Sequence, residues 1–173
     1  MKYLNCLIVI ILMVMQLLFA QIIDSHGVCG TPSMSSEEII RIKTAVDEWL
    51  PTRSRNEAIH IYVAWHVITS SNGTGNYSDQ SIYDCMALLN ANYLEHNFFF
   101  TLDTINRTAN DDWFNSWEDQ NASEGMQALA IDPYHYLNIY TANLNAIGVE
   151  GYSYLPNSWA NNSFMQSVNL DYR

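Results

Sequence analysis

"IHIYVAWHVITSSNGTGNYSD", residues 59–79, joins a strongly β-prone run to a loop of Ser, Asn and Gly. Side chains of a strand alternate between its two faces, so the run places two separate sets of residues on opposite sides. Neither set is clearly polar, which is typical of a central strand covered on both sides. One face would carry Ile59, Ile61, Val63, Trp65 and Val67, and the other His60, Tyr62, Ala64, His66 and Ile68.

The first twenty residues are expected to be a secretory signal peptide rather than part of the fold. Lys2 is followed by the apolar run "LIVIILMVMQLLFA", which ends at Ala20 before Gln21. A short apolar core behind one basic residue is typical of a cleaved signal, and an uncleaved anchor is the alternative. The protein is therefore expected to be secreted and extracellular, with no membrane association after cleavage.

The remaining chain has the length of one ordinary domain and is strongly acidic. The whole sequence of 173 residues carries 7 basic and 18 acidic side chains, a net charge of −11. Nucleic acids and anionic lipids need clustered Lys and Arg, so this balance argues against both as partners.

Two features of the exported part concern covalent chemistry. Cys29 and Cys85 remain after the signal, and export favours a disulfide between them, although free thiols are an equally ordinary state. Five Asn-x-Ser/Thr sequons are possible glycosylation sites in a eukaryotic secretory pathway. They lie at Asn72, Asn76, Asn106, Asn121 and Asn161.

The order of predicted elements indicates an α/β fold. "SSEEIIRIKTAVDEWLP" is predicted to be a helix, with Ser35 and Glu38 at capping-box spacing and Pro51 as its stop. Ser78 is predicted to cap a second helix. A strand "FFFTLDTINRT", a Trp-rich loop "NDDWFNSWEDQN", a short helix "SEGMQALAID" and strands "YLNIYTANL", "GYSYLP" and "QSVNLDYR" follow. Alternating strands and helices favour a mostly parallel sheet with right-handed crossovers.

No familiar catalytic constellation is present in these residues. No two histidines are four apart, and HExxH, GxSxG, Walker and GxGxxG motifs are absent. The acidic cluster Asp111, Asp112, Glu118 and Asp119 lacks EF-hand spacing and is interpreted as a solvated loop rather than a calcium site. His66, central in a two-sided strand beside Trp65, is interpreted as a core histidine and not as a metal ligand.

Taken together, several segments in order resemble pappalysin-type metallopeptidases, relatives of pregnancy-associated plasma protein-A in the metzincin clan. They are "CGTP", "IYVAWHVI" with "GTGNYSDQSI", "LLNANY", "FFFTLDTINRTANDDWF", "SEGMQALAIDPYHYLNIYTANL" and "GYSYLP". The resemblance implies an upper subdomain with a twisted, mostly parallel five-stranded sheet, a backing helix and an antiparallel edge strand beside the cleft. It also implies a later helix with HExxHxxGxxH, which binds zinc and supplies the general base, followed by a Met-turn.

This sequence departs from that pattern because it reaches Arg173 without the zinc-binding helix. We therefore expect an amino-terminal fragment of a secreted zinc endopeptidase, acting on protein or peptide substrates when complete. Zinc is expected in the complete enzyme, and this chain alone is expected to bind none and to be inactive. The alternative is a short secreted binding module without catalysis. The expected division is a signal at 1–20, a pro-segment-like helix and linker at 21–56, and a truncated catalytic domain at 57–173.

The resemblance also assigns two candidate sites. Gly151, Tyr152, Ser153, Tyr154 and Leu155 would form the substrate-facing edge strand, a place that suits Pro156. Cys29 in "GVCGTP" resembles a cysteine-switch ligand that would occupy zinc's open position in a latent form. Arg53 and Arg55 would then lie in the activation cleavage site. A disulfide with Cys85, or two unrelated cysteines, are the alternatives.

Overall fold

The computed structural model describes residues 28–49, 58–155 and 158–173. The expected signal at 1–20 and the expected cleavage site at Arg53 and Arg55 lie outside these residues. Five strands form one sheet in the order β2-β1-β3-β5-β4, parallel except for the last pair. Their bounds are β1 Ile59–Thr69, β2 Phe98–Ala109, β3 Tyr136–Ala142, β4 Gly151–Ser153 and β5 Ser167–Asp171. The predicted α/β fold with an antiparallel edge strand is confirmed.

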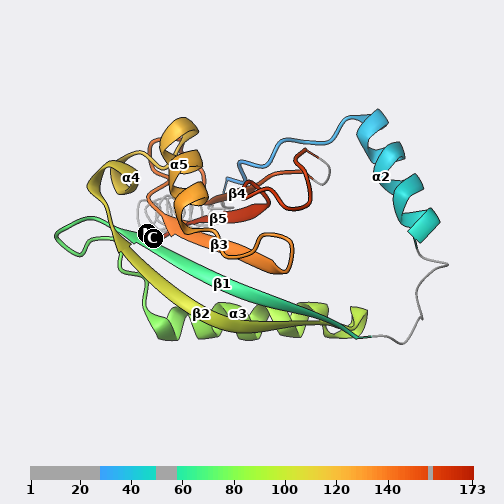
Figure 1. Cartoon of the computed structure of the whole chain (residues 1–173), viewed down its shortest axis with the longest axis horizontal. Helices are drawn as coiled ribbons and strands as arrows, with labels where there is room; N and C mark the ends of the chain where they lie inside the picture. Colours follow the sequence, from blue (N-terminus) through green and yellow to red (C-terminus); the bar gives the residue numbers. More distant parts are fainter. Residues whose placement is uncertain (1–27, 50–57, 156–157) are drawn as a thin grey trace, which may run out of the picture.

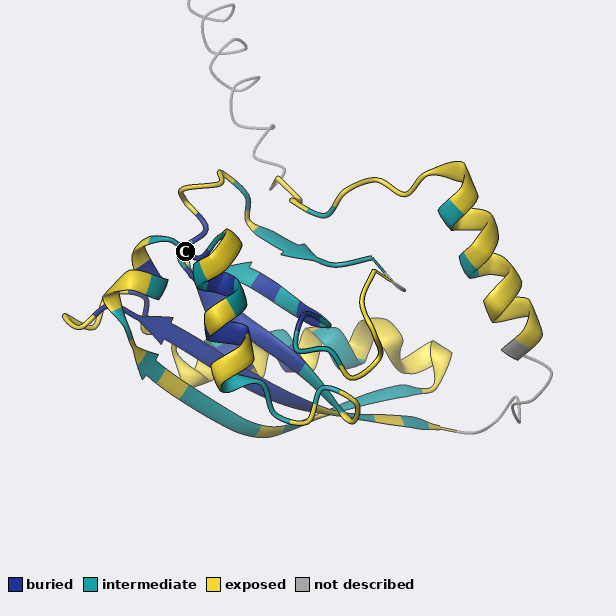
Figure 2. Cartoon of the chain, turned by 45° about the horizontal axis from the view of Figure 1, so that its top comes forward, coloured by how far each residue is buried: buried dark blue, intermediate teal, exposed yellow. Residues whose placement is uncertain are grey.

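The opening stretch forms the interior strand β1, as its two apolar faces predicted. It pairs in parallel with β2 on one side and with β3 on the other. Every residue from Val63 to Thr69 is buried, and Figure 2 shows β1 and β3 as the most deeply buried ribbons. Covered strands of this kind tolerate apolar residues on both faces because neither face meets water.

Helices cover the two faces of the sheet, which gives three layers (Figure 1). On one face α3, Asp79–Tyr93, packs Ile82 and Met86 against the odd-numbered residues of β1. On the other face α4, Asp111–Asn115, and α5, Asp119–Leu129, pack against Ile68 and Tyr140. The predicted cap of α3 is confirmed, because the Ser78 side chain accepts a hydrogen bond from the Ser81 amide.

The Trp-rich stretch predicted to be a loop contains α4, and α5 begins at Asp119 rather than at the Ser of "SEGMQALAID". The side chain of Asn110 caps α4 by accepting a hydrogen bond from the Trp113 amide. Trp117 is 1% exposed and donates its indole N–H to Asn169 of β5 at 2.8 Å. Burial of this indole fixes the link between α4 and α5, and Phe114, 5% exposed, anchors α4 itself.

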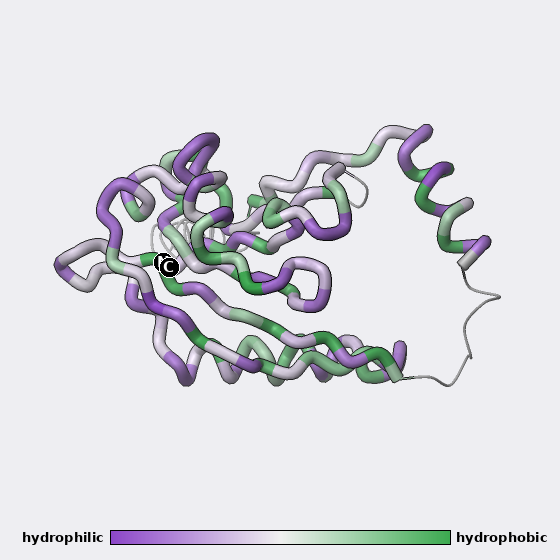
Figure 3. The backbone as a smooth tube through the Cα atoms, viewed as in Figure 1, coloured by the Kyte–Doolittle hydropathy of each residue, from purple (hydrophilic) through white to green (hydrophobic). Residues whose placement is uncertain are grey.

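The amino-terminal helix α2, Ser36–Trp49, forms as predicted but stands away from the sheet (Figure 1). Glu38 reaches back to the Ser35 amide at 2.8 Å, and Ser35 accepts from the Glu38 amide, which completes the capping box. Figure 3 shows apolar and polar residues alternating along this helix. Its apolar residues Ile39, Ile40 and Val46 are exposed.

His66 is a core residue, as the sequence predicted. It is fully buried, and its ring stacks on Tyr140 with centroids 4.6 Å apart. Its Nε2 lies 3.0 Å from Asn138 Oδ1, which also accepts a bond from the Ile131 amide. Because that oxygen can only accept, His66 Nε2 carries the proton. Burial lowers the pKa of His66, against a smaller opposite effect of the Asn138 bond.

Candidate functional site: the edge of the sheet at β4

The sheet ends in the short strand β4, which pairs antiparallel with β5. Gly151 lies opposite Leu170, and Ser153 lies opposite Val168. The strand is three residues long, so Tyr154 and Leu155 of the predicted edge segment lie just beyond it. An edge strand presents unpaired backbone N–H and C=O groups that another extended chain can use.

Residues Val28–Thr31, here called the edge segment, lie along this outer side of β4. The Gly30 amide donates to the Gly151 carbonyl, and the Glu150 amide donates to the Val28 carbonyl, both at 2.8 Å. Cys29 forms a parallel bridge with Gly151. The edge segment therefore runs in the same direction as β4.

Side chains add to this pairing and restrict it. The Ser153 amide donates to Thr31 Oγ1 at 2.9 Å. A Cβ atom at Gly30 would lie 3.1 Å from Val149 and 3.2 Å from Tyr152. Glycine therefore lets the edge segment approach β4 closely at this position.

Register places the Cys29 side chain on the face of the sheet that α3 covers elsewhere. Paired residues of neighbouring strands share a face. Trp65, on the face that α3 covers, pairs with Ile139, and Thr141, two residues farther along β3, pairs with Leu170. Leu170 pairs with Gly151, which forms the bridge with Cys29, so all of these residues belong to the same face. A groove of about 390 Å³, here called the edge groove, lies there. It is lined by Val28, Cys29, Thr31, Glu150, Gly151, Tyr152, Ser153, Val168 and Leu170.

The edge groove continues an open half of this face. The helix α3 packs against β1 and β2, whereas Leu137 of β3 and Val168 of β5 are only half-buried. A second, larger hollow of about 770 Å³ lies over the starts of β1, β3 and β5 and is lined by both residues. Apolar strand residues that remain open to solvent mark a surface suited to another element.

Cys29 and Cys85 are both free, and they lie on separate segments of the chain. Cys29 is exposed beside β4, whereas Cys85 sits on α3 with its sulfur 3.6 Å from Tyr77 Oη. Hydrogen bonds from the Thr31 amide and hydroxyl lower the pKa of the Cys29 thiol. A lowered pKa favours the thiolate, which is the nucleophilic and metal-binding form of cysteine.

The residues that the structure describes do not provide a zinc site of their own. Nowhere in 28–49, 58–155 or 158–173 do three His, Cys, Asp or Glu side chains gather around one point. A catalytic zinc needs about three protein ligands and an open position. The donor set of the described residues thus does not fit zinc.

The sequence predicts roles for Cys29 and for the edge strand, but it does not indicate that Gly30 and Thr31 belong to the same site. No local sequence pattern indicates the close packing at Gly30 or the hydrogen bond that Thr31 accepts from the Ser153 amide. The "CGTP" motif contains both residues, but their contacts arise from chain segments about 120 positions apart.

Comparison with known proteins relates the chain to proteases. It is 31% identical over 139 residues to an "Extracellular metalloprotease" of Verticillium alfalfae and 26% identical over 144 residues to one of Pyricularia oryzae. These alignments cover 76% and 79% of this chain but 48% and 50% of the relatives. The chain thus spans about half the length of these curated relatives. No family profile matches it.

A solved structure shares the fold. A mutant of Tannerella forsythia promirolysin superimposes with a TM-score of 0.56 at 20% sequence identity. The match covers 83% of this chain and 59% of the other. Within the described part of the chain, no helix is long and apolar enough to cross a membrane.

Proposed function

We propose that this chain forms the sheet-bearing part of the catalytic domain of a secreted, pappalysin-like zinc endopeptidase. The sequence relationship to proteins named extracellular metalloproteases supports the class of enzyme. The sheet order and the single antiparallel edge strand agree with the architecture that the pappalysin resemblance implies. In this proposal residues 57–173 belong to the catalytic domain, and residues 21–56 form a pro-segment.

The observation that carries the proposal is that the outer side of β4 already binds an extended peptide, the edge segment. Backbone amide and carbonyl groups of the edge segment and of residues 150–151 make these bonds, so the bonds do not depend on side-chain identity. In the active enzyme, a substrate would lie antiparallel to β4 and use the same backbone groups. β4 would then fix the register of the substrate without selecting its sequence.

The edge segment would hold the enzyme latent. It occupies the strand that the substrate needs, and it runs parallel to β4, opposite to the proposed direction of a substrate. A peptide bound in reverse presents its scissile groups in the wrong orientation for attack. Cys29 faces the edge groove, where its thiolate would bind the zinc of the complete enzyme.

The open half of the α3-covered face would receive the zinc-binding helix. Val168 and Leu170 provide apolar side chains there, next to Cys29. A helix seated on these residues would bring its metal ligands beside β4. This arrangement would place the metal, the Cys29 sulfur and the substrate strand around one groove.

A direct test compares two forms of the protein. The 173-residue chain should not cleave denatured casein in the presence of zinc, because it has no HExxH sequence. Cleavage that a chelator abolishes would contradict this expectation. The coding sequence beyond Arg173 should continue into HExxHxxGxxH, and a stop codon in an intact transcript would favour a non-catalytic binding protein instead.

Latency is tested in a form that contains the zinc-binding helix. Cys29→Ala should remove the delay before activity appears, whereas Cys85→Ala should retain the delay. An unchanged delay in the Cys29 variant would exclude the proposed latent role. A Cys29–Cys85 disulfide would appear as a loss of two mass units that reduction reverses, and its presence would also exclude that role.

A further inference from the structure

We propose that the loop between β1 and α3 carries two N-linked glycans, at Asn72 and Asn76, and that the sequon at Asn121 stays unmodified in the folded protein. A glycan is attached through the amide nitrogen of asparagine, and the bulky sugar fits the folded chain only where this nitrogen faces solvent. The hydrogen bonds made by each amide show which of its two atoms is available.

Asn72 presents its amide nitrogen to solvent. The residue is exposed, and its Oδ1 accepts hydrogen bonds from Thr74 through the amide at 2.9 Å and the hydroxyl at 2.7 Å. The amide of Thr74 can only donate, so the oxygen of Asn72 must face it. Among the described residues, no group bonds Asn72 Nδ2.

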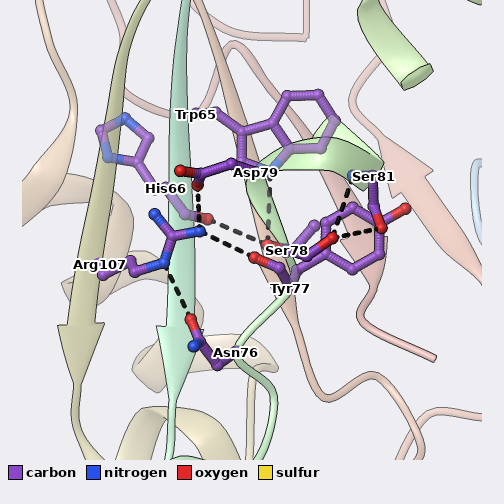
Figure 4. Close-up of polar contacts among 9 residues, drawn as sticks. Trp65, His66, Asn76, Tyr77, Ser78, Asp79, Ser81 and Arg107 are labelled. Carbon is purple, nitrogen blue, oxygen red and sulfur yellow. Dashed lines mark hydrogen bonds and ion pairs between the residues drawn. The ribbon is translucent and has the colours of Figure 1, made fainter. Parts of the chain in front are cut away.

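The orientation of the Asn76 amide follows in the same way from its hydrogen bond with Arg107 of β2. Arg107 Nε donates to Asn76 Oδ1 at 2.9 Å, and its guanidinium also bonds the Tyr77 carbonyl and Asp79. Figure 4 shows the Asn76 amide with its oxygen toward Arg107. A guanidinium only donates, so the nitrogen lies on the other side of the amide. A glycan on that nitrogen leaves the Arg107 contacts intact.

Asn121 differs because its amide nitrogen, the atom that would carry the glycan, makes a hydrogen bond within the protein. It is half-buried on α5, and its Nδ2 donates to the Asp112 carbonyl of α4 at 3.4 Å. A carbonyl only accepts, so the nitrogen must face the protein. A glycan replaces one of the two hydrogens on Nδ2, so a sugar at Asn121 would have to fit beside the contact between α4 and α5, where the half-buried side chain leaves less room than at the exposed Asn72 and Asn76.

The chemistry requires a lipid-diphosphate-linked oligosaccharide as the co-substrate in the secretory pathway. A bond forms between the amide nitrogen and C1 of the first sugar, and the C1–oxygen bond to the diphosphate breaks. The nitrogen loses one proton, and the lipid diphosphate leaves with the bonding electron pair. No oxidation or reduction takes place.

The two sites lie in a loop beside β2, at the opposite edge of the sheet from β4. Glycans there would cover the loop and the end of β2 and leave the edge groove open. The inference rests on the export that the proposed function includes, but not on peptidase activity, so it can fail in a protein that proves to be a peptidase and hold in one that does not.

The test expresses the full chain in a yeast secretory host and recovers it from medium and cell extract. Digestion with an endoglycosidase that leaves one N-acetylglucosamine, followed by peptide mass spectrometry, locates each occupied asparagine. Asn72 and Asn76 should carry the sugar, and monomeric chain separated by size exclusion should have unmodified Asn121. An unmodified Asn72 or Asn76 in both fractions, or a glycan at Asn121 in the monomer, would overturn the inference.

Matched variants sharpen the result. Thr74→Ser should keep the glycan at Asn72 and Thr74→Ala should lose it, because only the serine retains the hydroxyl of the sequon. Asn72→Gln and Asn76→Gln should each remove one glycan step in gel mobility, and Asn121→Gln should remove none from the monomeric fraction. These readings use denatured protein, so they remain valid for a variant that folds poorly.

Discussion

The two edges of the sheet are protected in different ways. The edge strand β2 is 12 residues long, whereas β4 at the opposite edge has three. Side chains from elements packed around it hold β2, and a separate backbone segment covers β4. An exposed edge strand is a template for pairing with another chain, so each edge needs some form of protection.

At β2 the protection is built into the core. Asn90 of α3 donates to the Phe100 carbonyl at 2.9 Å and accepts from the Phe100 amide at 2.8 Å. Its amide therefore replaces the peptide group of a neighbouring strand. Asn90 also donates to the Met86 carbonyl, which fixes its orientation. Removing this protection would require α3 to move.

At β4 the protection is local. The edge segment contacts β4 through a few backbone bonds, and Val28, Cys29 and Gly30 are all exposed. Such segments can open without unfolding of the sheet. The two edges therefore differ in kind: a side chain of the packed helix α3 closes β2 at Phe100, whereas a short backbone segment covers β4.

The largest expected effect is a loss of stability of the whole sheet, which would affect both edges together. Trp117→Ala deletes a 1% exposed indole that bonds Asn169, and we expect a loss of about 3–5 kcal/mol in the free energy of unfolding. Urea unfolding followed by circular dichroism measures it. Trp159→Ala, at a side chain 44% exposed, is the control and should cost less than about 1 kcal/mol. Equal losses would contradict the assignment of Trp117 to the core.

The next effect concerns β2 alone. Asn90→Leu leaves the Phe100 amide and carbonyl without their partner in a half-buried place, so we expect a loss of about 1–3 kcal/mol. Urea unfolding measures the loss, and light scattering should detect more self-association. Asn92→Leu, on the exposed side of α3, should show neither change. A stable and monomeric Asn90 variant would show that β2 does not need this closure.

Acid should weaken the sheet through His66, which lies between the two edges. Burial lowers the pKa of His66 in the folded state, so below about pH 6.5 the unfolded chain binds more protons. Stability should therefore fall as the pH falls from about 6.5, by up to about 1.4 kcal/mol per pH unit. Unfolding free energies between pH 7.5 and about 5 measure the slope. His66→Gln should flatten it, whereas the exposed His96→Gln should not.

The variant expected to change the global free energy of unfolding least acts locally at β4. Gly30→Val places a branched side chain against Val149 and Tyr152 and should detach the edge segment. Hydrogen exchange at the Glu150 and Ser153 amides should become roughly tenfold faster, which corresponds to about 1.4 kcal/mol of local opening.

The opposite edge provides the control for this variant. Exchange at the Phe100 amide and the global unfolding free energy should stay the same. Equal acceleration at both edges would mean that the edge segment is part of the cooperative core, and the distinction between the edges would then fail. Gly30→Ala should show an intermediate effect at β4.

Much of the fold could be predicted because its determinants are local. The two apolar faces of residues 59–69 predicted a covered interior strand, and Ser35 and Ser78 marked the starts of two helices. The order of strands and helices then predicted the parallel sheet. The helix α4 was missed because its stability comes from burial of Trp113 and Phe114 in the assembled core, and a local pattern of Asn, Asp and Trp does not encode that contact.

The sequence by itself determined the apolar strands, the capped helices, the Cys-Gly pair and the absence of HExxH between Met1 and Arg173. Only the tertiary structure decided that Cys29 lies beside Gly151, that a Cβ atom at Gly30 would meet Val149, and that the edge segment runs parallel to β4. Backbone hydrogen bonds between strands form with almost any residue, so the residues themselves do not specify their partner. Partner and direction at β4 follow from where the rest of the chain holds the two segments.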